Sequence, residues 1–201
     1  MPNPDPARRN EKSRRAVLTA TLDLLHDLPY PQLSIEGIAT RAGVGKQTIY
    51  RWWPSKAAVL FDAFLLLSED GEGALPVLPD TGDLRADLTL VLRATAAELN
   101  DPQLAAPMRA LATEITHDPA LAEAYHERLD APLREAKRQR LRSAQAAGEL
   151  DDDLDLDVAI DVIWGPVLNR WLQRSGPLSD EYIETLVTTV LEGMRRRSPC
   201  D

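Results

Sequence analysis

The sequence predicts an all-α protein of about nine helices, in which a three-helix N-terminal domain precedes a larger helical bundle. Apolar residues recur every three or four positions through most of the 201 residues, which is the spacing of one helix face. Capping residues, prolines and glycines stand where these stretches begin and end. We therefore predict an N-terminal domain at 1–54, a connecting helix at 55–70 and a C-terminal domain at 71–201.

Residues 33–60, LSIEGIATRAGVGKQTIYRWWPSKAAVL, have the pattern of two short helices joined by a tight turn. Ser34 is a favourable N-cap for the first helix. Gly43 stands where that helix ends, because glycine adopts the positive φ of a helix C-terminus without strain. The second helix is predicted to begin near Gly45. Pro54 stops it, because proline disfavours helical geometry in the residue before it.

The second short helix is predicted to bury Val44, Ile49 and Trp53 and to expose polar side chains, as a helix-turn-helix does with the helix that enters the major groove. Lys, Gln and Thr reach base edges, whereas Tyr and Trp hold phosphates. Lys56 begins the next helix, where a bound phosphate would balance its charge and the helix dipole. The predicted DNA-binding residues are Lys46, Gln47 and Thr48 for bases, Ser34, Tyr50, Trp52 and Lys56 for phosphates, and Gly45 at the helix start.

Charge is distributed unevenly along the chain. The net charge is −9, which by itself argues against a nucleic-acid partner. Residues 1–60, however, hold nine Lys and Arg against five acids, whereas residues 61–201 hold 14 against 27. The first part therefore carries +4 and the second −13. This distribution directs DNA to the N-terminal part of the molecule.

Residues 38–60 resemble the DNA-binding segment of the TetR family of bacterial transcriptional regulators, nearly position by position. Three residues depart from the family's pattern. Gly45 stands where Ser is common, Gln47 where Gly or Thr is usual, and Trp53 where Phe is usual. A looser resemblance links residues 148–193 to the C-terminal half of one TetR subgroup. In that half, Asn169 stands where a Tyr is expected.

This resemblance implies a cytoplasmic, homodimeric repressor that binds double-stranded DNA at a palindromic operator and is released by an unknown small-molecule effector. The effector would bind in the C-terminal domain and shift the connecting helix. Trp164 and Trp171 are read as core or pocket-wall residues, with the core favoured. The candidate effector-contacting residues are Met108, Tyr125, Trp164, Leu168 and Asn169.

The remaining pattern is helical. Residues 1–7, with three prolines, are predicted to be a disordered arm. Arg134, Lys137, Arg138, Arg140 and Arg142 are predicted to form a solvated outer face. The last two helices are apolar on two sides, so we expect them to form a four-helix homodimer interface. The helices are predicted at about Asn10–Leu28, Ser55–Glu69, Asp83–Asn100, Pro102 onward, Asp118–Ala147, Leu156–Gln173 and Ser179–Arg196.

Several patterns that resemble other chemistry fail on inspection. Gly43-Val44-Gly45-Lys46 lacks the Gly at 40 and the Ser or Thr at 47 that a phosphate-binding P-loop needs. The acidic run 151–157 lacks the glycine and closing glutamate of a calcium loop. His117, Glu123, His126 and Glu127 are better explained as solvated surface. We therefore predict no catalytic residues, metal or cofactor.

The sequence leaves two alternatives open: a helical enzyme or small-molecule carrier with an incidental helix-turn-helix, and a repressor without an effector. A membrane partner is not expected, because no run approaches the roughly 18 apolar residues of a membrane helix. The N-terminus lacks the apolar region of a secretory signal. Cys200 is the single cysteine, which fits a reducing cytoplasm.

Overall fold

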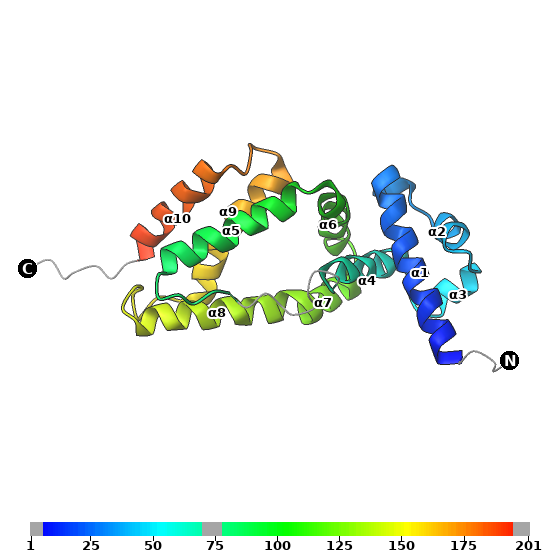
Figure 1. The fold of residues 1–201 in the computed structure, drawn as a ribbon, viewed down its shortest axis with the longest axis horizontal. Coiled ribbons are helices and arrows are strands. Elements are labelled where there is room, and N and C mark those ends of the chain that lie inside the picture. The colour runs from blue at the N-terminus through cyan, green and yellow to red at the C-terminus, as the bar shows by residue number, and fades with distance from the viewer. Residues whose placement is uncertain (1–5, 70–77, 195–201) are drawn as a thin grey trace, which may run out of the picture. The chain divides into compact units, whose positions relative to one another are not determined.

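Helices form all the regular structure in residues 6–69 and 78–194, the part of the chain that the computed structural model describes (Figure 1). The predicted all-α fold is confirmed. In chain order the elements are α1 (Pro6–Asp27), the 3-10 turn η1 (Tyr30–Gln32), α2 (Ile35–Ala42), α3 (Lys46–Tyr50), α4 (Lys56–Glu69), α5 (Leu84–Asn100), α6 (Pro102–Ile115), α7 (Pro119–Tyr125), the π-helical segment η2 (His126–Asp130), α8 (Ala131–Ala146), α9 (Leu156–Gln173) and α10 (Asp180–Met194).

These helices form two compact units. Unit 1 comprises Met1–Gly73 and Asp101–Tyr125, and unit 2 comprises Ala74–Asn100 and His126–Asp201. Helices α6 and α7, which the sequence assigned to the C-terminal domain, thus pack with the N-terminal helices. The apolar α4 explains this, because it needs partners on more than one side and contacts α1, α6 and α7. The predicted domain boundaries remain a prediction.

Helix α1 provides much of the core of unit 1. Val17, Leu18, Leu24 and Leu25 are buried on one face of the helix. The buried Thr21 donates its hydroxyl to the Val17 carbonyl at 2.9 Å. The helix begins earlier than predicted, at Pro6 instead of near Asn10. Proline is tolerated in a first helical turn because the N–H groups there have no intrahelical acceptor. The predicted arm is therefore wrong for residues 6 and 7, and residues 1–5 lie outside the described part.

Unit 2 is built from α5, α8, α9 and α10. Leu92 of α5, Leu141 of α8 and Ile183 of α10 are completely buried. The indole Nε1 of buried Trp171 donates to the Leu99 carbonyl at 2.7 Å. The core interpretation of Trp171 is thereby confirmed.

The single long helix predicted from Asp118 to Ala147 is wrong in its middle. Asp118 does cap the start, because its Oδ1 accepts hydrogen bonds from the backbone N–H groups of residues 120 and 121. The chain then passes through the π-helical η2 before α8. Pro132 gives the reason: it has no N–H to donate to the Arg128 carbonyl, and its ring would clash with that carbonyl in an α-helix. Gly148 follows α8 with a φ of +74°, the left-handed conformation that glycine adopts at helix C-termini.

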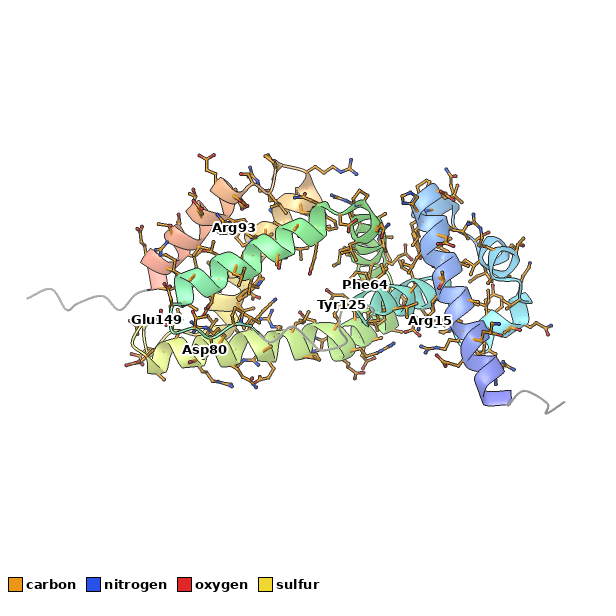
Figure 2. The ribbon with its side chains drawn as sticks, viewed as in Figure 1. Arg15, Phe64, Asp80, Arg93, Tyr125 and Glu149 are labelled. Atoms are coloured by element: carbon orange, nitrogen blue, oxygen red, sulfur yellow. The ribbon has the colours of Figure 1, made fainter. Side chains whose placement is uncertain are left out.

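Arg140 is not part of an exposed basic face, so that prediction is wrong for this residue. Only 3% of Arg140 is exposed, and its Nε and Nη2 donate to Oδ2 of buried Asp87 at 2.9 and 2.7 Å. Asp80 and Glu149, labelled in Figure 2, lie 3.5 and 3.8 Å from the same guanidinium. The backbone N–H and the hydroxyl of Thr81 also donate to Asp87. This buried network ties the segment before α5 to α5 and α8.

Of the other residues of the predicted basic face, Arg142 is exposed as predicted, whereas Arg134, Lys137 and Arg138 are only partly exposed. Arg134 and Arg138 pair with acids of α9, at 2.8 Å to Asp161 and 2.6 Å to Asp157. Arg142 pairs with Glu135 on its own helix at 3.1 Å. The acidic partners are solvated, so these pairs neutralise the basic run and contribute little stability.

Candidate nucleic-acid interface

The first half of the interface is α2 with its two ends. The Ser34 hydroxyl accepts a hydrogen bond from the Gly37 N–H at 3.1 Å, which confirms the predicted N-cap. Gly43 ends the helix in the left-handed conformation, at φ 66° and ψ 34°, which confirms the predicted turn. Any residue with a Cβ would be strained there. The Val44 N–H then bonds the Ala39 carbonyl at 3.0 Å, so the turn that aims the next helix is fixed by backbone bonds.

Helix α3 has one buried side and one exposed side. Ile49 is completely buried, whereas Lys46, Gln47 and Tyr50 are exposed, with 55% of Tyr50 accessible. Thr48 is half-buried. The polar side of α3 is therefore accessible on the surface of unit 1, as contact with DNA bases requires.

The end of α3 comes two residues earlier than predicted. The helix stops at Tyr50, and the N–H groups of Trp52 and Trp53 both bond the Ile49 carbonyl, at 2.9 and 3.0 Å. Trp53 is buried after the helix, while Trp52 is half-buried. Ends of short helices vary by one or two residues, and Pro54 limits only how far the helix can extend.

Lys46 forms an ion pair with Glu36 of α2, and both side chains are more than half exposed. The hydrogen bond from Lys46 lowers the pKa of the Glu36 carboxyl below its ordinary value. A DNA phosphate or base would have to replace Glu36 as the partner of Lys46. We therefore expect Glu36 to weaken DNA binding, both by occupying Lys46 and by repelling phosphates.

We expect Glu36→Gln to bind operator DNA about two- to fivefold more tightly than the wild type, because an exposed pair of this kind is worth under about 1 kcal/mol. Fluorescence anisotropy with labelled duplex measures the change. Asp27→Asn is the matched control, since it removes an exposed carboxylate of the same unit that pairs with Arg41 at 3.5 Å. Weaker binding by Glu36→Gln would show that Lys46 needs Glu36 to hold it in place.

Lys56 has partners within the protein. Its Nζ donates to the backbone carbonyls of Tyr30 and Leu33 at 3.1 and 3.0 Å, and lies 4.1 Å from the centre of the Tyr30 ring. An ammonium has three N–H donors, so these two bonds use most of its capacity. Lys56 thus fixes η1 against the start of α4. Its phosphate contact remains a prediction.

Arg51 is a cation beside the predicted phosphate-binding residues that was not among them. It is exposed directly after α3, and its guanidinium lies 5.1 Å from the centre of the Trp52 ring. Its Nη2 is 3.4 Å from Oδ1 of Asn10 on α1. The signal for it was present in the sequence, because a basic residue stands between Tyr50 and Trp52.

The structure divides the five candidate effector residues. Met108 and Tyr125 belong to unit 1, and both are partly buried. The ring centre of Tyr125, labelled in Figure 2, lies 6.0 Å from that of Phe61. In unit 2, Leu168 and Asn169 are exposed on α9. Their roles as effector contacts remain predictions.

Trp164 is only partly buried, so the prediction of a core residue is wrong for it. Its ring centre lies 4.6 Å from Nζ of Lys137 on α8. Burial lowers the pKa of that lysine below its ordinary value. The ammonium makes a cation–π contact with the Trp164 ring.

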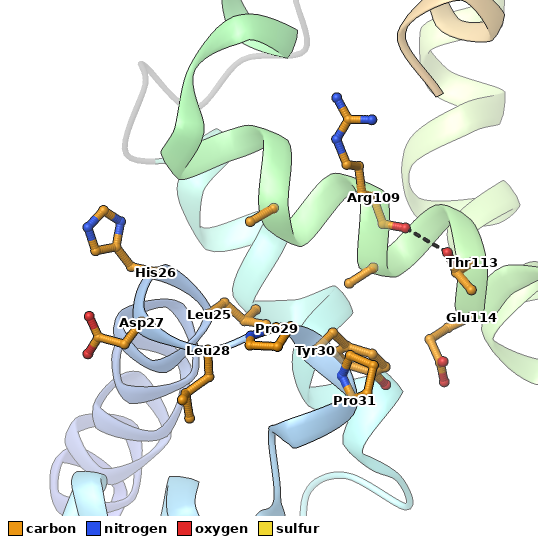
Figure 3. A pocket seen from close by; sticks show the side chains of 12 residues that line it. Leu25, His26, Asp27, Leu28, Pro29, Tyr30, Pro31, Arg109, Thr113 and Glu114 are labelled. Atoms are coloured by element: carbon orange, nitrogen blue, oxygen red, sulfur yellow. Dashed lines mark hydrogen bonds between the residues drawn. The ribbon is translucent and has the colours of Figure 1, made fainter. Parts of the chain in front are cut away.

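A pocket of about 450 Å³ lies within unit 1, between the end of α1, η1 and α6 (Figure 3). Leu25, Tyr30, Arg109 and Glu114 are among its lining residues, and none of the five candidates is. Burial raises the pKa of Tyr30 far above its ordinary value, and the Glu114 carboxylate adds to the shift.

Fixed by its buried side against α2 and open on its polar side, α3 is the second helix of a helix-turn-helix, and the chain is a DNA-binding protein of that class. Two family comparisons place it further. Residues 17–63 match "Bacterial regulatory proteins, tetR family", and residues 78–190 match "Tetracyclin repressor-like, C-terminal domain". The chain belongs to the TetR family of transcriptional regulators.

Individual relatives agree over nearly the whole length. The HTH-type transcriptional regulator YdeS of Bacillus subtilis is 35% identical over 190 residues, or 94% of this chain and 93% of YdeS. The DNA-binding transcriptional repressor TetR of Mycobacteroides abscessus is 32% identical over 185 residues, or 91% of this chain and 94% of that protein. The crystal structure of the TetR family transcription regulator SCO0332 has a TM-score of 0.70 and 35% identity, covering 92% of this chain and 100% of that one.

The predicted family is therefore confirmed, and with it a regulator in place of an enzyme. The hypothesis of a helical enzyme with an incidental helix-turn-helix is set aside. Among the described residues, no helix has the length and apolar character needed to cross a membrane.

Proposed function

We propose that this regulator is a homodimeric repressor that binds a palindromic operator in the cytoplasm and leaves it when a small-molecule effector binds. The accessible polar side of α3 is the observation that carries the proposal. Lys46, Gln47 and Thr48 read bases in the major groove. Ser34, Tyr50, Trp52 and Lys56 position the phosphate backbone, and Gly45 begins the reading helix. A two-fold dimer places two such helices about 34–36 Å apart, one turn of duplex DNA.

An exposed apolar face on α9 supports the dimer. Val158, Val162, Leu168 and Leu172 are between 38% and 56% exposed, although all four are large apolar side chains. Gly165 lies on the same face, with open space where a Cβ would stand. A contiguous apolar face of this kind on a soluble domain marks an interface. A second copy of α9 and α10 covers it and completes a four-helix bundle.

The effector acts through the contacts of α4. Helix α4 packs on α1 and on α6, so a displacement of α4 reaches the DNA-binding helices within unit 1. The dimer has one conformation in which the spacing of the two α3 helices fits the operator and one in which it does not. The effector needs only to bind the second conformation more tightly than the first. Leu168 and Asn169 lie on the exposed side of α9, so they line an effector site only where the partner protomer covers them.

Two substitutions separate base reading from phosphate contact, on operators obtained by an unbiased DNA selection with the purified protein. We expect Gln47→Ala to relax sequence preference, by about 1–3 kcal/mol at one base position. Lys56→Ala should weaken binding equally on all sequences and lower the salt slope by about one unit. Filter binding across a salt series measures both.

Lys56 also holds two backbone carbonyls, so the folded fraction of Lys56→Ala is measured by urea unfolding and used to correct its affinity. Equal effects of the two variants on sequence preference would show that the roles are wrongly assigned. A selection that enriches no palindrome would refute the proposed function.

A further inference from the structure

One carboxylate oxygen of Asp62, in the second turn of α4, accepts hydrogen bonds from two other parts of unit 1. The indole Nε1 of Trp53, just after the helix-turn-helix, donates to Oδ2 of Asp62 at 2.9 Å. Nη2 of Arg14 on α1 donates to the same oxygen at 2.9 Å. Only 12% of the Asp62 side chain is exposed. Asp62 therefore joins α1, α4 and the segment after α3.

Trp53 connects this carboxylate to the predicted DNA surface. The Trp53 ring is buried and meets Trp52 edge-on, with ring centres 5.5 Å apart and planes at 84°. The guanidinium of Arg14 lies 5.9 Å from the Trp53 ring. A phenylalanine, the usual residue at this position, would bring no N–H, whereas a buried indole needs an acceptor. Asp62 supplies that acceptor, so the orientation of Trp53, and of Trp52 against it, depends on α4.

We propose that Asp62 is a positioning residue for operator binding, which sets the end of α3 relative to α1 and α4. The proposal rests on the proposed reading of DNA by α3. Hydrogen bonds to a carboxylate are shorter and stronger than those between neutral groups. Because both donors share one oxygen, a movement of α4 acts on Trp53 and Arg14 together. Asp62 thereby transmits the position of α4 to the reading helix.

Electrostatics alone predicts the opposite effect of removing this charge. A carboxylate in a DNA-binding unit repels phosphates, so its loss should strengthen binding to any duplex. Loss of a positioning residue should instead weaken binding to the operator and leave non-specific binding intact. Whether operator affinity rises or falls on removal of the charge therefore distinguishes a purely electrostatic effect from a positioning role.

The experiment compares Asp62→Asn with the matched control Asp27→Asn on the selected operator and on an unrelated duplex, at one salt concentration. We expect Asp62→Asn to bind the operator about tenfold more weakly and the unrelated duplex no more weakly than the wild type. Asp27→Asn should stay within about twofold on both. Affinities are corrected for the folded fraction from urea unfolding, which removes a purely structural effect.

If Asp62→Asn binds the operator as tightly as Asp27→Asn does, the positioning role is refuted while the proposed function stands. If the wild type itself shows no operator preference, the proposed function fails and this proposal fails with it. These outcomes are separated by the wild-type measurement.

A double-mutant cycle with Trp53→Phe tests the pairing itself. In the Trp53→Phe background, Asp62→Asn should weaken operator binding by about threefold or less, because the indole donor is already absent. The indole N–H NMR signal that Trp53→Phe removes identifies Trp53. In Asp62→Asn that signal should shift and exchange faster with solvent. A full tenfold loss in the Trp53→Phe background would overturn the coupling between the two residues.

Discussion

Asp87→Ala is expected to lower the free energy of unfolding by about 3–5 kcal/mol, because it leaves the buried Arg140 guanidinium without its closest partner. The two residues are each 3% exposed and are joined by hydrogen bonds of 2.7 and 2.9 Å. Urea unfolding followed by circular dichroism measures the loss. Arg142→Ala is the control, because Arg142 is an exposed ion-pair residue on α8, the helix that holds Arg140. It should change the free energy of unfolding by less than about 1 kcal/mol.

Replacing both partners gives a stricter comparison. The double variant Asp87→Leu with Arg140→Met should recover much of the lost stability, because apolar side chains of similar volume leave no buried charge unpaired. The single variants Asp87→Leu and Arg140→Met are measured alongside. If the double variant loses as much unfolding free energy as the two single variants lose in total, the pair is not the reason for the effect.

The same pair has a defined pH dependence. Burial raises the pKa of Asp87, but hydrogen bonds from Thr81 and Arg140 outweigh it, and the net pKa lies below the ordinary value. A carboxyl whose pKa is lower in the folded protein stabilises the fold above its unfolded pKa, and loses that contribution as the pH falls. The difference between wild type and Asp87→Asn should therefore be complete at pH 7 and narrow below about pH 4.

Val162→Lys combined with Leu172→Lys is expected to convert the protein to a monomer and to weaken operator binding at least about a hundredfold. A charged side chain on the apolar face of α9 cannot be buried against a second copy. A monomer reads one half-site, so it loses the gain from binding both halves at once. Sedimentation velocity and binding to full and half operators measure the two effects.

Leu90→Lys is the matched control, because Leu90 is 62% exposed on α5 and lies on neither helix of the proposed interface. It should remain dimeric and bind as the wild type does. A wild type that sediments as a monomer at micromolar concentration, or a double variant that still dimerises, would refute the interface.

Local signals made the helix-turn-helix predictable almost residue by residue. Ser34, Gly43 and Ser55 each act through backbone groups within four residues, so their effects are visible in the sequence. Pro132 was an equally local signal for the break between α7 and α8, and the apolar periodicity on either side of it concealed that break.

Long-range partners explain what sequence reasoning missed. Arg140 looks like its exposed neighbours until Asp87, 53 residues away, is placed against it. The indole of Trp53 was recognised as buried, but nothing nearby in the sequence named Asp62 or Arg14 as its companions. The candidate effector residues remain predictions, because the residues that line a site come from separate helices, and periodicity does not specify how those helices pack.

The bonds of Lys56 to the Tyr30 and Leu33 carbonyls have a mechanical consequence. They attach the start of α4 to the segment just before α2, so these two parts of the chain move together. A displacement of α4 would therefore move α2 and α3 with it as one rigid body. Release from the operator would then require no unfolding of these helices.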